Sequence, residues 1–410
     1  MKKILIVSTG YMWFPCETGP SRFYYIADYL VNAGYVVDIV TVDFQHFKKA
    51  PRDTENILAQ GYPFNITFIN TPPYKKNIGL ARIKSNSVVA GRVVKHLEGC
   101  IKDYDACYVT IPSNNVAAKV TGLCRKNGVP CVVDVEDLWP EAMSMVLKND
   151  TLRNTMLHKL LRDAETAYAN ASGIIGTSDD YTDRAFKKRQ RDIPSKTVYV
   201  GVKLKTFDEG VDKYKDDITK PEGEIRVTYA GSLATSYDIS TLIDAAKLIE
   251  EAGRNDIRIH ILGTGPMEDD FKTYAAEKEA SNVIFHGYKK YPEMAAFLAS
   301  SDMTINSFVK GAPQSIVNKI GDYLASGKPM INTLENPVFT SLVDRYSFGV
   351  NVPAADAQAL SDAIVKLSDE SDTRETMGRN ARRTAEEEFD TDRTYGRIVD
   401  MIESVMGAAI

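Results

Sequence analysis

Short apolar segments recur along the chain and alternate with segments of helical periodicity. In the first half, six runs rich in β-branched residues predict buried strands at 3–8, 35–42, 66–69, 106–110, 130–135 and 172–178. Two segments between them, 21–34 and 114–128, place apolar side chains three and four positions apart and close on a glycine, which predicts helices. Almost continuously apolar strands that alternate with helices indicate a parallel sheet covered on both faces.

The same alternation resumes after a polar segment. Residues 205–223 are charged, contain Gly and Pro, and show no hydrophobic period, so we expect a domain boundary there or just before. Six further runs then predict strands at 224–230, 256–263, 282–287, 302–308, 328–333 and 348–352, with a helix at 240–253 and a helix-rich end at 356–408. The pattern predicts two Rossmann-like, doubly wound α/β domains, 1–203 and 204–388, and a helix at 389–410 that crosses back to the first domain.

Two such domains in tandem place the carboxyl ends of two parallel sheets at a shared cleft. Ligands bind at these ends in doubly wound folds, so the architecture indicates a nucleotide or sugar-nucleotide enzyme.

Composition narrows the class of protein. With 410 residues, 44% hydrophobic and 26% charged, the chain suits two or three globular domains and excludes a disordered or collagen-like protein. Apolar runs such as residues 4–7 are far shorter than the roughly 20 residues of a membrane span, and we expect no secretory signal. The net charge of -5 argues against nucleic acid as a partner.

The chain has five cysteines, Cys16, Cys100, Cys107, Cys124 and Cys131, and none of them forms a CxxC pair. An odd number without metal-type spacing favours buried free thiols in a reducing cytoplasm over a metal site or a disulfide framework. We therefore expect a cytoplasmic protein without a metal.

The turn after the first strand carries small and polar residues. Gly19, Ser21 and Arg22 stand at the entry to the helix predicted at 21–34, whose free N–H groups suit an anion or a sugar hydroxyl. The alternative is an ordinary strand-to-helix loop with a serine cap.

A second polar group follows the strand at 130–135. Three acids, Asp134, Glu136 and Asp137, are placed to hold sugar hydroxyls or to deprotonate an acceptor, and Trp139 is placed to stack on a sugar ring. The alternative is a helix start in which Asp137 is the cap and Pro140 lies in the first turn.

The first strand of the second domain leads into a glycine turn. Three of its backbone N–H groups are candidates for binding phosphate oxygens: those of Gly231, Ser232 and Leu233. A tight turn that needs glycine for geometry alone is the alternative. Gly263 and Gly265 form a second turn, but Glu268 stands where a dinucleotide fingerprint has its third glycine, so the pattern does not indicate NAD.

Residues 307–333 hold the densest set of candidates. The pattern predicts a strand that ends near Phe308 and a helix from about 315 to 325, with Gln314 and Ser315 at its start and Asp322 two turns further on. Such a helix start can receive a sugar or phosphate oxygen, and the acid can hold ribose hydroxyls. A solvated helix face is the alternative for Asp322.

Taken together, these motifs resemble glycosyltransferase family 4, whose members are retaining enzymes with the GT-B fold of two facing Rossmann-like domains and a cleft between them. The resemblance covers nearly the whole chain. It is carried by DLWP (137–140), AGSL…YDI (230–239), LGTGP (262–266) and, most specifically, P-x4-NK-x2-DYLASGKP (313–329). DLWP is similar to the branch that works on capsule, O-antigen and exopolysaccharide repeat units.

The resemblance implies a nucleotide-sugar site in the second domain. The family's Glu-x7-Glu motif falls on Gln314, near the donor sugar, and on Asp322, which holds the ribose. The other residues that it assigns to the donor are Gly231, Ser232, Leu233, Gly263, Gly265, Gly287, Tyr288, Ser315, Ile316 and Lys319. The basic pair of the family's phosphate turn is replaced by Ser232 and Tyr237, so charge neutralisation would depend on backbone N–H groups, helix dipoles and cations such as Lys319 or Arg22.

The resemblance also implies a reaction. A sugar passes from a UDP- or GDP-sugar to an acceptor with retention, and the leaving phosphate takes the acceptor's proton, so the protein mainly positions the reactants and stabilises charge. Glu136, Asp137 and Gln314 are the catalytic candidates; Gly19, Ser21, Arg22 and Trp139 are the acceptor-side candidates. No separate cofactor and no metal are expected, and domain closure is expected to hinge near 200–223.

We expect the acceptor on the first domain. Residues 44–102 hold ten Lys/Arg against three Asp/Glu. They include Lys48, Lys49, Arg52, Lys75, Lys76, Arg82, Lys84, Arg92 and Lys95, interleaved with Phe44, Phe47, Tyr62 and Tyr74. Such a surface suits an anionic inner membrane leaflet and a polyprenyl-diphosphate-linked saccharide, which predicts a peripheral location. A basic, solvated helix face is the alternative.

Three other functions remain open at this point. The same fold serves sugar-nucleotide 2-epimerases and glycan phosphorylases, the latter with pyridoxal phosphate on a lysine. A non-catalytic sugar-nucleotide-binding or scaffold protein is the third, supported by Gln314 and the missing basic pair.

Overall fold

The computed structural model describes residues 1–10, 12–17, 21–46, 48–75, 79–137, 150–187 and 192–407. The chain forms two compact units: the N-unit, Met1–Val198 with Tyr395–Ile410, and the C-unit, Tyr199–Thr394. The sequence predicts these divisions at 203/204 and 388/389.

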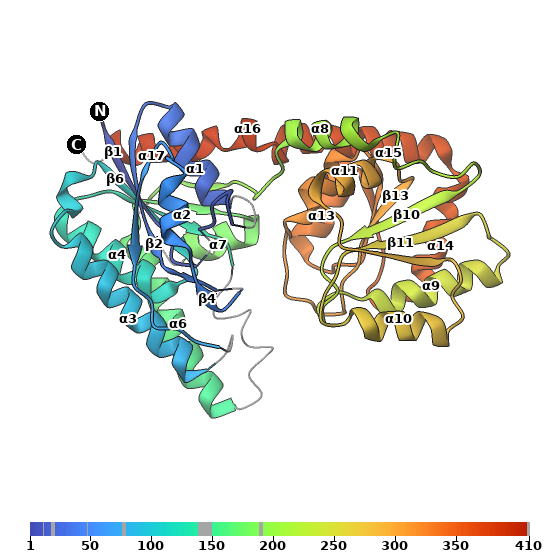
Figure 1. Cartoon of the computed structure of the whole chain (residues 1–410), viewed down its shortest axis with the longest axis horizontal. Helices are drawn as coiled ribbons and strands as arrows, with labels where there is room; N and C mark the ends of the chain where they lie inside the picture. The colour runs from blue at the N-terminus through green and yellow to red at the C-terminus, as the bar shows by residue number, and fades with distance from the viewer. Residues whose placement is uncertain are drawn as a thin grey trace. The chain divides into compact units, whose positions relative to one another are not determined.

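The N-unit is built on a seven-stranded parallel sheet in the order β5-β2-β1-β6-β7-β8-β9 (Figure 1). The strands are β1 (Lys3–Val7), β2 (Val36–Val42), β5 (Asn65–Ile69), β6 (Ala106–Ile111), β7 (Cys131–Val135), β8 (Gly173–Gly176) and β9 (Ser195–Thr197). A small antiparallel pair, β3 (Phe44–Gln45) and β4 (Ala50–Pro51), follows β2. The strand order reverses between β1 and β6, which is the topological switch point of this sheet.

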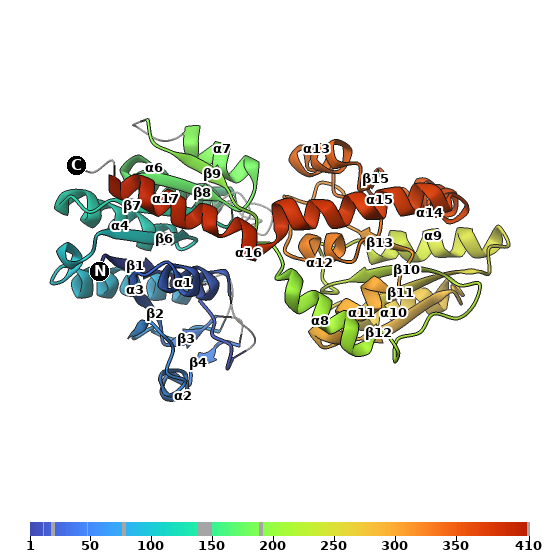
Figure 2. The ribbon, with the colours of Figure 1, turned by 90° about the horizontal axis from the view of Figure 1, so that it is seen from above.

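Helices cover both faces of the N-unit sheet. They are α1 (Arg22–Asn32), α2 (Thr54–Ala59), α3 (Leu80–Leu97), the 3-10 helix η1 (Ile101–Asp103), α4 (Asn114–Asn127), α6 (Asp150–Asn170), α7 (Asp179–Lys187) and α17 (Gly396–Gly407). Apolar residues of α3, α4 and α6 share one core with the sheet, and those of α1 and α17 share the other. Figure 2 shows α17, at the red end of the chain, beside α1.

The C-unit repeats the design with a six-stranded parallel sheet in the order β12-β11-β10-β13-β14-β15. The strands are β10 (Ile225–Ala230), β11 (Ile257–Leu262), β12 (Val283–Gly287), β13 (Met303–Asn306), β14 (Met330–Asn332) and β15 (Gly349–Asn351). The switch point lies between β10 and β13, so a ligand crevice is expected beyond the carboxyl ends of these strands.

The C-unit sheet is also enclosed by helices. They are α8 (Leu204–Tyr214), α9 (Ile239–Glu251), α10 (Glu268–Glu277), α11 (Tyr291–Ala299), α12 (Lys319–Ala325), α13 (Pro337–Tyr346), α14 (Ala357–Asp369), α15 (Ser371–Thr384), the π-helical turn η2 (Ala385–Phe389) and α16 (Thr391–Thr394). One core contains residues of α9 and α14, and the other contains residues of α8, α11, α12 and α13. Among the described helices, none has the length and apolar character that a membrane span requires.

The predicted fold class is confirmed, and all twelve predicted strands are present. The prediction that residues 205–223 lack a hydrophobic period is wrong, because α8 occupies the first half of that segment. Leu204 and Phe207 are buried and Val211 packs on the same core, which gives an apolar stripe at helical spacing. The stripe begins one residue before the predicted polar segment.

Candidate functional site

A cavity of about 380 Å³ opens at the switch point of the C-unit sheet. Its walls come from the ends of β10 and β11, the residues after β12, and helices α11 and α12. The lining residues are Ala230, Gly231, Ser232, Leu262, Gly263, Thr264, Tyr288, Lys289, Tyr291, Met294, Leu298, Lys319, Asp322 and Tyr323. We call this cavity the donor pocket. Six of the predicted donor residues line it: Gly231, Ser232, Gly263, Tyr288, Lys319 and Asp322.

Two glycine turns meet at the floor of the donor pocket. A Cβ on Gly263 would lie 1.8 Å from the Gly231 carbonyl oxygen, and a Cβ on Gly265 would lie 2.2 Å from that of Leu233. Gly263 also has φ +135°, a conformation that other residues rarely adopt. These glycines therefore allow two backbone segments to touch, which a side chain at either position would prevent.

This packing occupies two of the three backbone N–H groups that were predicted to bind phosphate. The Gly231 N–H donates to the Leu262 carbonyl at 2.9 Å, and the Leu233 N–H donates to the Thr264 carbonyl at 3.0 Å. Leu233 is fully buried, and α9 begins only at Ile239, so the turn does not lead directly into a helix. Of the three groups, the Ser232 N–H is the one that these backbone bonds leave for a ligand.

Gly263→Ala should lower the free energy of unfolding by about 2 kcal/mol and weaken nucleotide binding, because the added methyl group forces the two turns apart. Chemical denaturation with and without UDP measures both effects. Gly253→Ala is the control, since Gly253 also has a positive φ of 81° but nothing within 4 Å of its Cβ position. Equal losses in the two variants would show that backbone strain, not close approach, matters at Gly263.

Lys319 is the buried cation of the donor pocket. Its Nζ has no hydrogen-bond partner among the described residues. It lies 4.3 Å from the ring centre of Tyr229, 4.6 Å from that of Tyr237, 5.3 Å from Phe308 and 5.5 Å from Tyr323. Burial lowers the pKa of Lys319 to about 7. An anion beside this amine would stabilise its charged form, so the pocket is suited to bind a negatively charged group there.

Asp322 enters the same pocket from α12. Its Oδ1 accepts a hydrogen bond of 2.8 Å from the Tyr291 hydroxyl on α11. Burial raises the pKa of Asp322 to about 6, and the Tyr291 hydroxyl partly offsets this shift. A desolvated carboxylate with free acceptor capacity is suited to bind a pair of hydroxyl groups.

The predicted start of the helix at 315 is wrong, since α12 begins at Lys319. Ile316 and Val317 are β-branched, which lowers their helix propensity, and they pack against the core of this face from a bend before the helix. Ser315 is buried, and neither it, Ile316 nor Gln314 lines the donor pocket. The Gln314 Oε1 is nevertheless buried and has no hydrogen-bond partner among the described residues.

The rim of the donor pocket contains residues that the sequence predicted and residues that it did not. Tyr288 is 73% exposed, which is unusual for an aromatic residue and leaves its ring open to a planar ligand. Gly287 precedes it with φ +66°, and its carbonyl accepts from the Gly263 N–H at 2.8 Å. Thr264, Lys289 and Tyr291 also line the pocket and were not predicted. Their sequence signal is only their position just after strands β11 and β12.

In the N-unit, Arg22 does not present its charge to a ligand. Its Nε donates to Asp134 Oδ2 at 2.9 Å, and both side chains are almost completely buried. The Tyr108 hydroxyl donates to the same oxygen at 2.6 Å, and the Tyr395 ring lies 5.2 Å from the guanidinium carbon. The role predicted for Arg22 at the donor diphosphate is therefore replaced by one in the core, where it joins α1 to β7 and the C-terminal segment.

Glu136 follows β7 next to this buried pair. Burial and the nearby Asp134 raise the pKa of Glu136 to about 8, and Arg22 opposes the shift. A carboxyl group of this kind can exchange a proton near neutral pH, as a general acid or base must. Asp137 is half-buried beside it.

The remaining acceptor-side candidates give less information. Ser21 occupies the position before α1, but its Oγ accepts from the Trp13 N–H at 3.1 Å instead of capping the helix. Gly19 and Trp139 lie outside the described residues.

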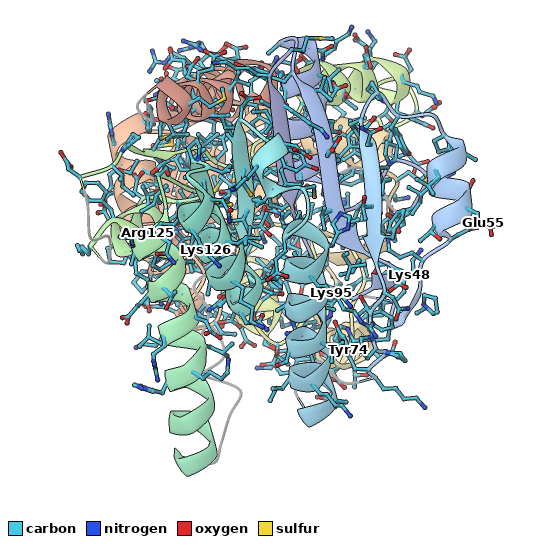
Figure 3. The ribbon with its side chains drawn as sticks, turned by 90° about the vertical axis from the view of Figure 1, so that its left-hand side faces the viewer. Lys48, Glu55, Tyr74, Lys95, Arg125 and Lys126 are labelled. Atoms are coloured by element: carbon cyan, nitrogen blue, oxygen red, sulfur yellow. The ribbon has the colours of Figure 1, made fainter. Side chains whose placement is uncertain are left out.

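The basic segment divides into buried and exposed members. The Arg52 side chain is buried and paired with Glu17, and Phe44 and Tyr74 are buried as well. Lys48, Lys75, Lys84, Arg92 and Lys95 are exposed. Figure 3 shows Lys48 and Lys95 on the α3 side of the N-unit, and Arg125 and Lys126 on α4. Lys76 and Phe47 lie outside the described residues.

Three cysteines that are separate in the sequence meet in the N-unit core. The sulfur atoms of Cys107, Cys124 and Cys131 all lie within 4.8 Å of one another, and the three side chains are buried. These cysteines are separated in the sequence, but the fold brings their thiols together. They are free thiols, surrounded by apolar residues on β6, α4 and β7.

Comparisons with known proteins agree with the geometry of the C-unit. Residues 210–384 match the family described as "Glycosyl transferases group 1". The chain is 25% identical to O-antigen chain mannosyltransferase C of Escherichia coli over 275 residues, 65% of this chain and 70% of the relative. It is 22% identical to the amylovoran biosynthesis glycosyltransferase AmsK of Erwinia amylovora over 47% of each chain, and 22% identical to alpha-D-kanosaminyltransferase of Streptomyces kanamyceticus over 63% of this chain and 66% of that relative.

Solved structures share the fold over almost the whole chain. Sucrose-phosphate synthase from Thermosynechococcus elongatus superposes with a TM-score of 0.72 at 16% identity and covers 100% of both chains. HepE of Anabaena in complex with UDP gives 0.70 at 15% identity, over 98% of this chain and 100% of that one. WaaG, a glycosyltransferase involved in lipopolysaccharide biosynthesis, gives 0.64 at 16% identity, over 97% and 99%. The chain therefore has the GT-B fold, and residues 210–384 of its C-unit are similar to the glycosyl transferases group 1 family.

Proposed function

We propose that this protein is a retaining, metal-independent glycosyltransferase of family 4 that uses a UDP- or GDP-sugar donor. Its acceptor is a saccharide linked to polyprenyl diphosphate, and its product belongs to a cell-surface polysaccharide. The observation that carries the proposal is the donor pocket, where one buried cation and one buried acid line a cavity inside the matched glycosyltransferase segment.

The chemistry of the donor pocket suits a nucleoside diphosphate. Lys319 would neutralise the diphosphate, Asp322 would accept hydrogen bonds from the ribose hydroxyls, and the exposed Tyr288 ring would contact the base. The complex of HepE with UDP, in a protein of the same fold, agrees with such a ligand. The family's phosphate turn carries two basic residues, and this chain has Ser232 and Tyr237 at those positions. Because Lys319 Nζ lies against the Tyr237 ring, Lys319 would supply the positive charge that this pair supplies elsewhere in the family.

Gln314 and Glu136 complete the proposed reaction. Gln314 would donate to the donor sugar through its amide, and Glu136 would orient the acceptor hydroxyl. Retention follows from the family resemblance, in which the leaving phosphate accepts the proton of the attacking hydroxyl on the same face of the sugar. The protein then contributes position and charge stabilisation.

Release of nucleotide that depends on the acceptor tests the proposal. The full chain is incubated with UDP- and GDP-sugars and a synthetic polyprenyl-diphosphate-linked monosaccharide, and NMR of the product gives its anomeric configuration. We expect stoichiometric release of UDP or GDP and a retained anomer. Donor binding without release with any acceptor would favour a scaffold, and conversion of the donor sugar without an acceptor would favour an epimerase.

We also propose that exposed lysines of the N-unit hold the protein at the anionic inner leaflet. Replacing Lys75, Lys84 and Lys95 by Gln should lower the partition coefficient onto phosphatidylglycerol-containing vesicles about 100-fold, since each lysine near such a surface contributes about 1 kcal/mol. Vesicle co-sedimentation at low and high salt measures this. Arg82 is left unchanged because it lines a pocket.

Arg125→Gln with Lys126→Gln is the matched control, because both side chains are exposed on α4. An equal loss in the control would indicate attraction by net charge alone. Unchanged binding in the triple variant would remove the membrane surface from the proposal.

A further inference from the structure

The three cysteines that meet in the N-unit core form a compact cluster of ligand atoms. Cys107 on β6 and Cys131 on β7 are register partners in the parallel sheet, so their side chains leave the sheet side by side on the same face. Cys124 approaches them from α4, where it continues the buried stripe of Val116 and Val120 at intervals of four residues. The fold therefore brings one thiol from each of three elements to a single point in the core.

The spacing of the sulfur atoms is close to that of ligands around one metal ion. The three Sγ atoms lie within 4.8 Å of one another. With metal–sulfur bonds of about 2.3 Å, three sulfurs in one plane around an ion are about 4 Å apart. Side-chain shifts of roughly 1 Å or less would therefore close the cluster on an ion.

The cluster offers sulfur ligands only. Among the described residues, no His, Asp or Glu joins these three cysteines as a possible ligand. The side chains around them belong to the apolar core that α3, α4 and α6 share with the sheet. Hydrogen bonds with Cys107 and Cys131 lower the pKa of Cys124 against the effect of burial, whereas hydrogen bonds with the other two thiols, together with burial, raise the pKa of Cys107. Cys124 is therefore the first of these two thiols to ionise.

We propose that the thiols of Cys107, Cys124 and Cys131 bind one Cu(I) ion in a three-coordinate site. Soft sulfur ligands favour Cu(I), Zn(II) and iron–sulfur clusters over hard cations. Structural zinc sites and iron–sulfur clusters take four protein ligands, and this cluster supplies three. Each thiol that binds the ion as a thiolate releases its proton to water, and no oxidant is required because the copper stays Cu(I).

This site is separate from the proposed sugar transfer. It belongs to the N-unit core, whereas the donor pocket belongs to the C-unit, so the ion would take no part in the reaction. The bound ion would join β6, β7 and α4 and would stabilise the folded N-unit. The proposal replaces our expectation, drawn from cysteine spacing, that the chain holds no metal.

Copper binding by the full chain tests this site. Because the sulfurs are buried, the ion is supplied in two ways: in copper-supplemented cells while the chain folds, and to the purified chain with a non-thiol reductant under nitrogen, where local opening gives access. We expect one Cu(I) per chain, an X-ray absorption spectrum with three sulfur ligands and no nitrogen or oxygen, and a higher melting temperature. Less than one ion per chain by both routes, or a nitrogen or oxygen ligand, would overturn the proposal.

Cysteine variants assign the bound ion to the cluster. Cys124→Ala should raise the Kd for Cu(I), measured by competition with a chromophoric chelator, about 100-fold or more, since even the loss of a group that only supports a metal ligand costs about 10- to 100-fold. Cys100→Ala is the matched control and should leave that Kd unchanged, because Cys100 is a partly buried cysteine outside the cluster.

Cys131→Val is a second variant that keeps an apolar side chain of similar size in the core. It should lose the ion as Cys124→Ala does, while circular dichroism and a cooperative thermal transition show that the chain is folded. Wild-type affinity for Cu(I) in folded Cys131→Val, or an equal loss of affinity in Cys100→Ala, would show that the ion binds elsewhere.

Discussion

Lys319→Met should lower kcat/KM for the sugar-nucleotide donor about 100-fold or more, the usual loss when one stabiliser of the developing negative charge is removed. The same change should raise the melting temperature of the ligand-free protein. Methionine fills the space among the four rings without the cost of burying a charge. The opposite signs of the two effects exclude misfolding as the cause of the lost activity.

The pH dependence gives a second measure of Lys319. Because its pKa is about 7 in the folded chain against 10.5 ordinarily, the unfolded chain keeps a proton between these values that the folded chain has lost. This group therefore makes stability rise with pH across that interval, and the rise should disappear in Lys319→Met. A bound diphosphate should restore the proton, so UDP binding at pH 8 should take up protons, which calorimetry in buffers of different ionisation enthalpy measures.

Lys310→Met is the control for these experiments, because Lys310 is exposed and does not line the donor pocket. Wild-type kinetics in Lys319→Met, or UDP binding without proton uptake, would show that the buried amine does not contact the diphosphate.

Asp322→Ala should raise the Kd for UDP about 10- to 100-fold, which corresponds to the loss of hydrogen bonds to a charged acceptor. Asp322→Asn should lie between the wild type and Asp322→Ala, because the amide keeps one acceptor oxygen. The pKa of Asp322 is about 6, so the carboxyl takes up a proton as the pH drops below this value. The affinity of the wild type for UDP should fall in the same pH range. With Lys319 losing its proton above 7, the affinity should be highest between these values.

UDP that lacks the ribose 2′- and 3′-hydroxyls tests the contact directly. The wild type should discriminate against this analogue, and Asp322→Ala should not, since the partner of the hydroxyls is gone. Tyr291→Phe removes the hydroxyl that donates to Asp322 and should change the UDP affinity only severalfold. Full discrimination in Asp322→Ala would contradict the ribose assignment.

The strands and the fold class were predictable because their signal is local. A strand buried on both faces, such as β6 or β7, must be apolar at almost every position, and this shows in a few consecutive letters. Helix α8 escaped prediction because charged residues outnumber its short apolar stripe. The start of α12 was placed four residues early because Ile316 and Val317 satisfy a helical pattern but lie in an irregular segment before the helix.

The candidate site was predictable where a family motif marks it. Lys319 and Asp322 belong to the run at 313–329, and both line the donor pocket. Arg22 looked equally suitable in the sequence, next to a helix start, but it pairs with Asp134, 112 residues further along the chain. Leu233 was also assigned to the donor but is a core residue, and Ile316 packs partly buried against the core, since a motif does not show which of its members face inward.

The sequence by itself determined that this protein has two doubly wound α/β units, that ligands belong at the ends of their strands, and which short segments carry polar groups there. Only the tertiary structure decided what surrounds each polar group. The rings around Lys319 come from positions 229, 237, 308 and 323, and the three thiols that meet in the N-unit core come from two strands and a helix. The physical reason is that burial of an element follows from its own residues, whereas the charge and pKa of a buried group depend on side chains that strand order brings together from distant parts of the chain.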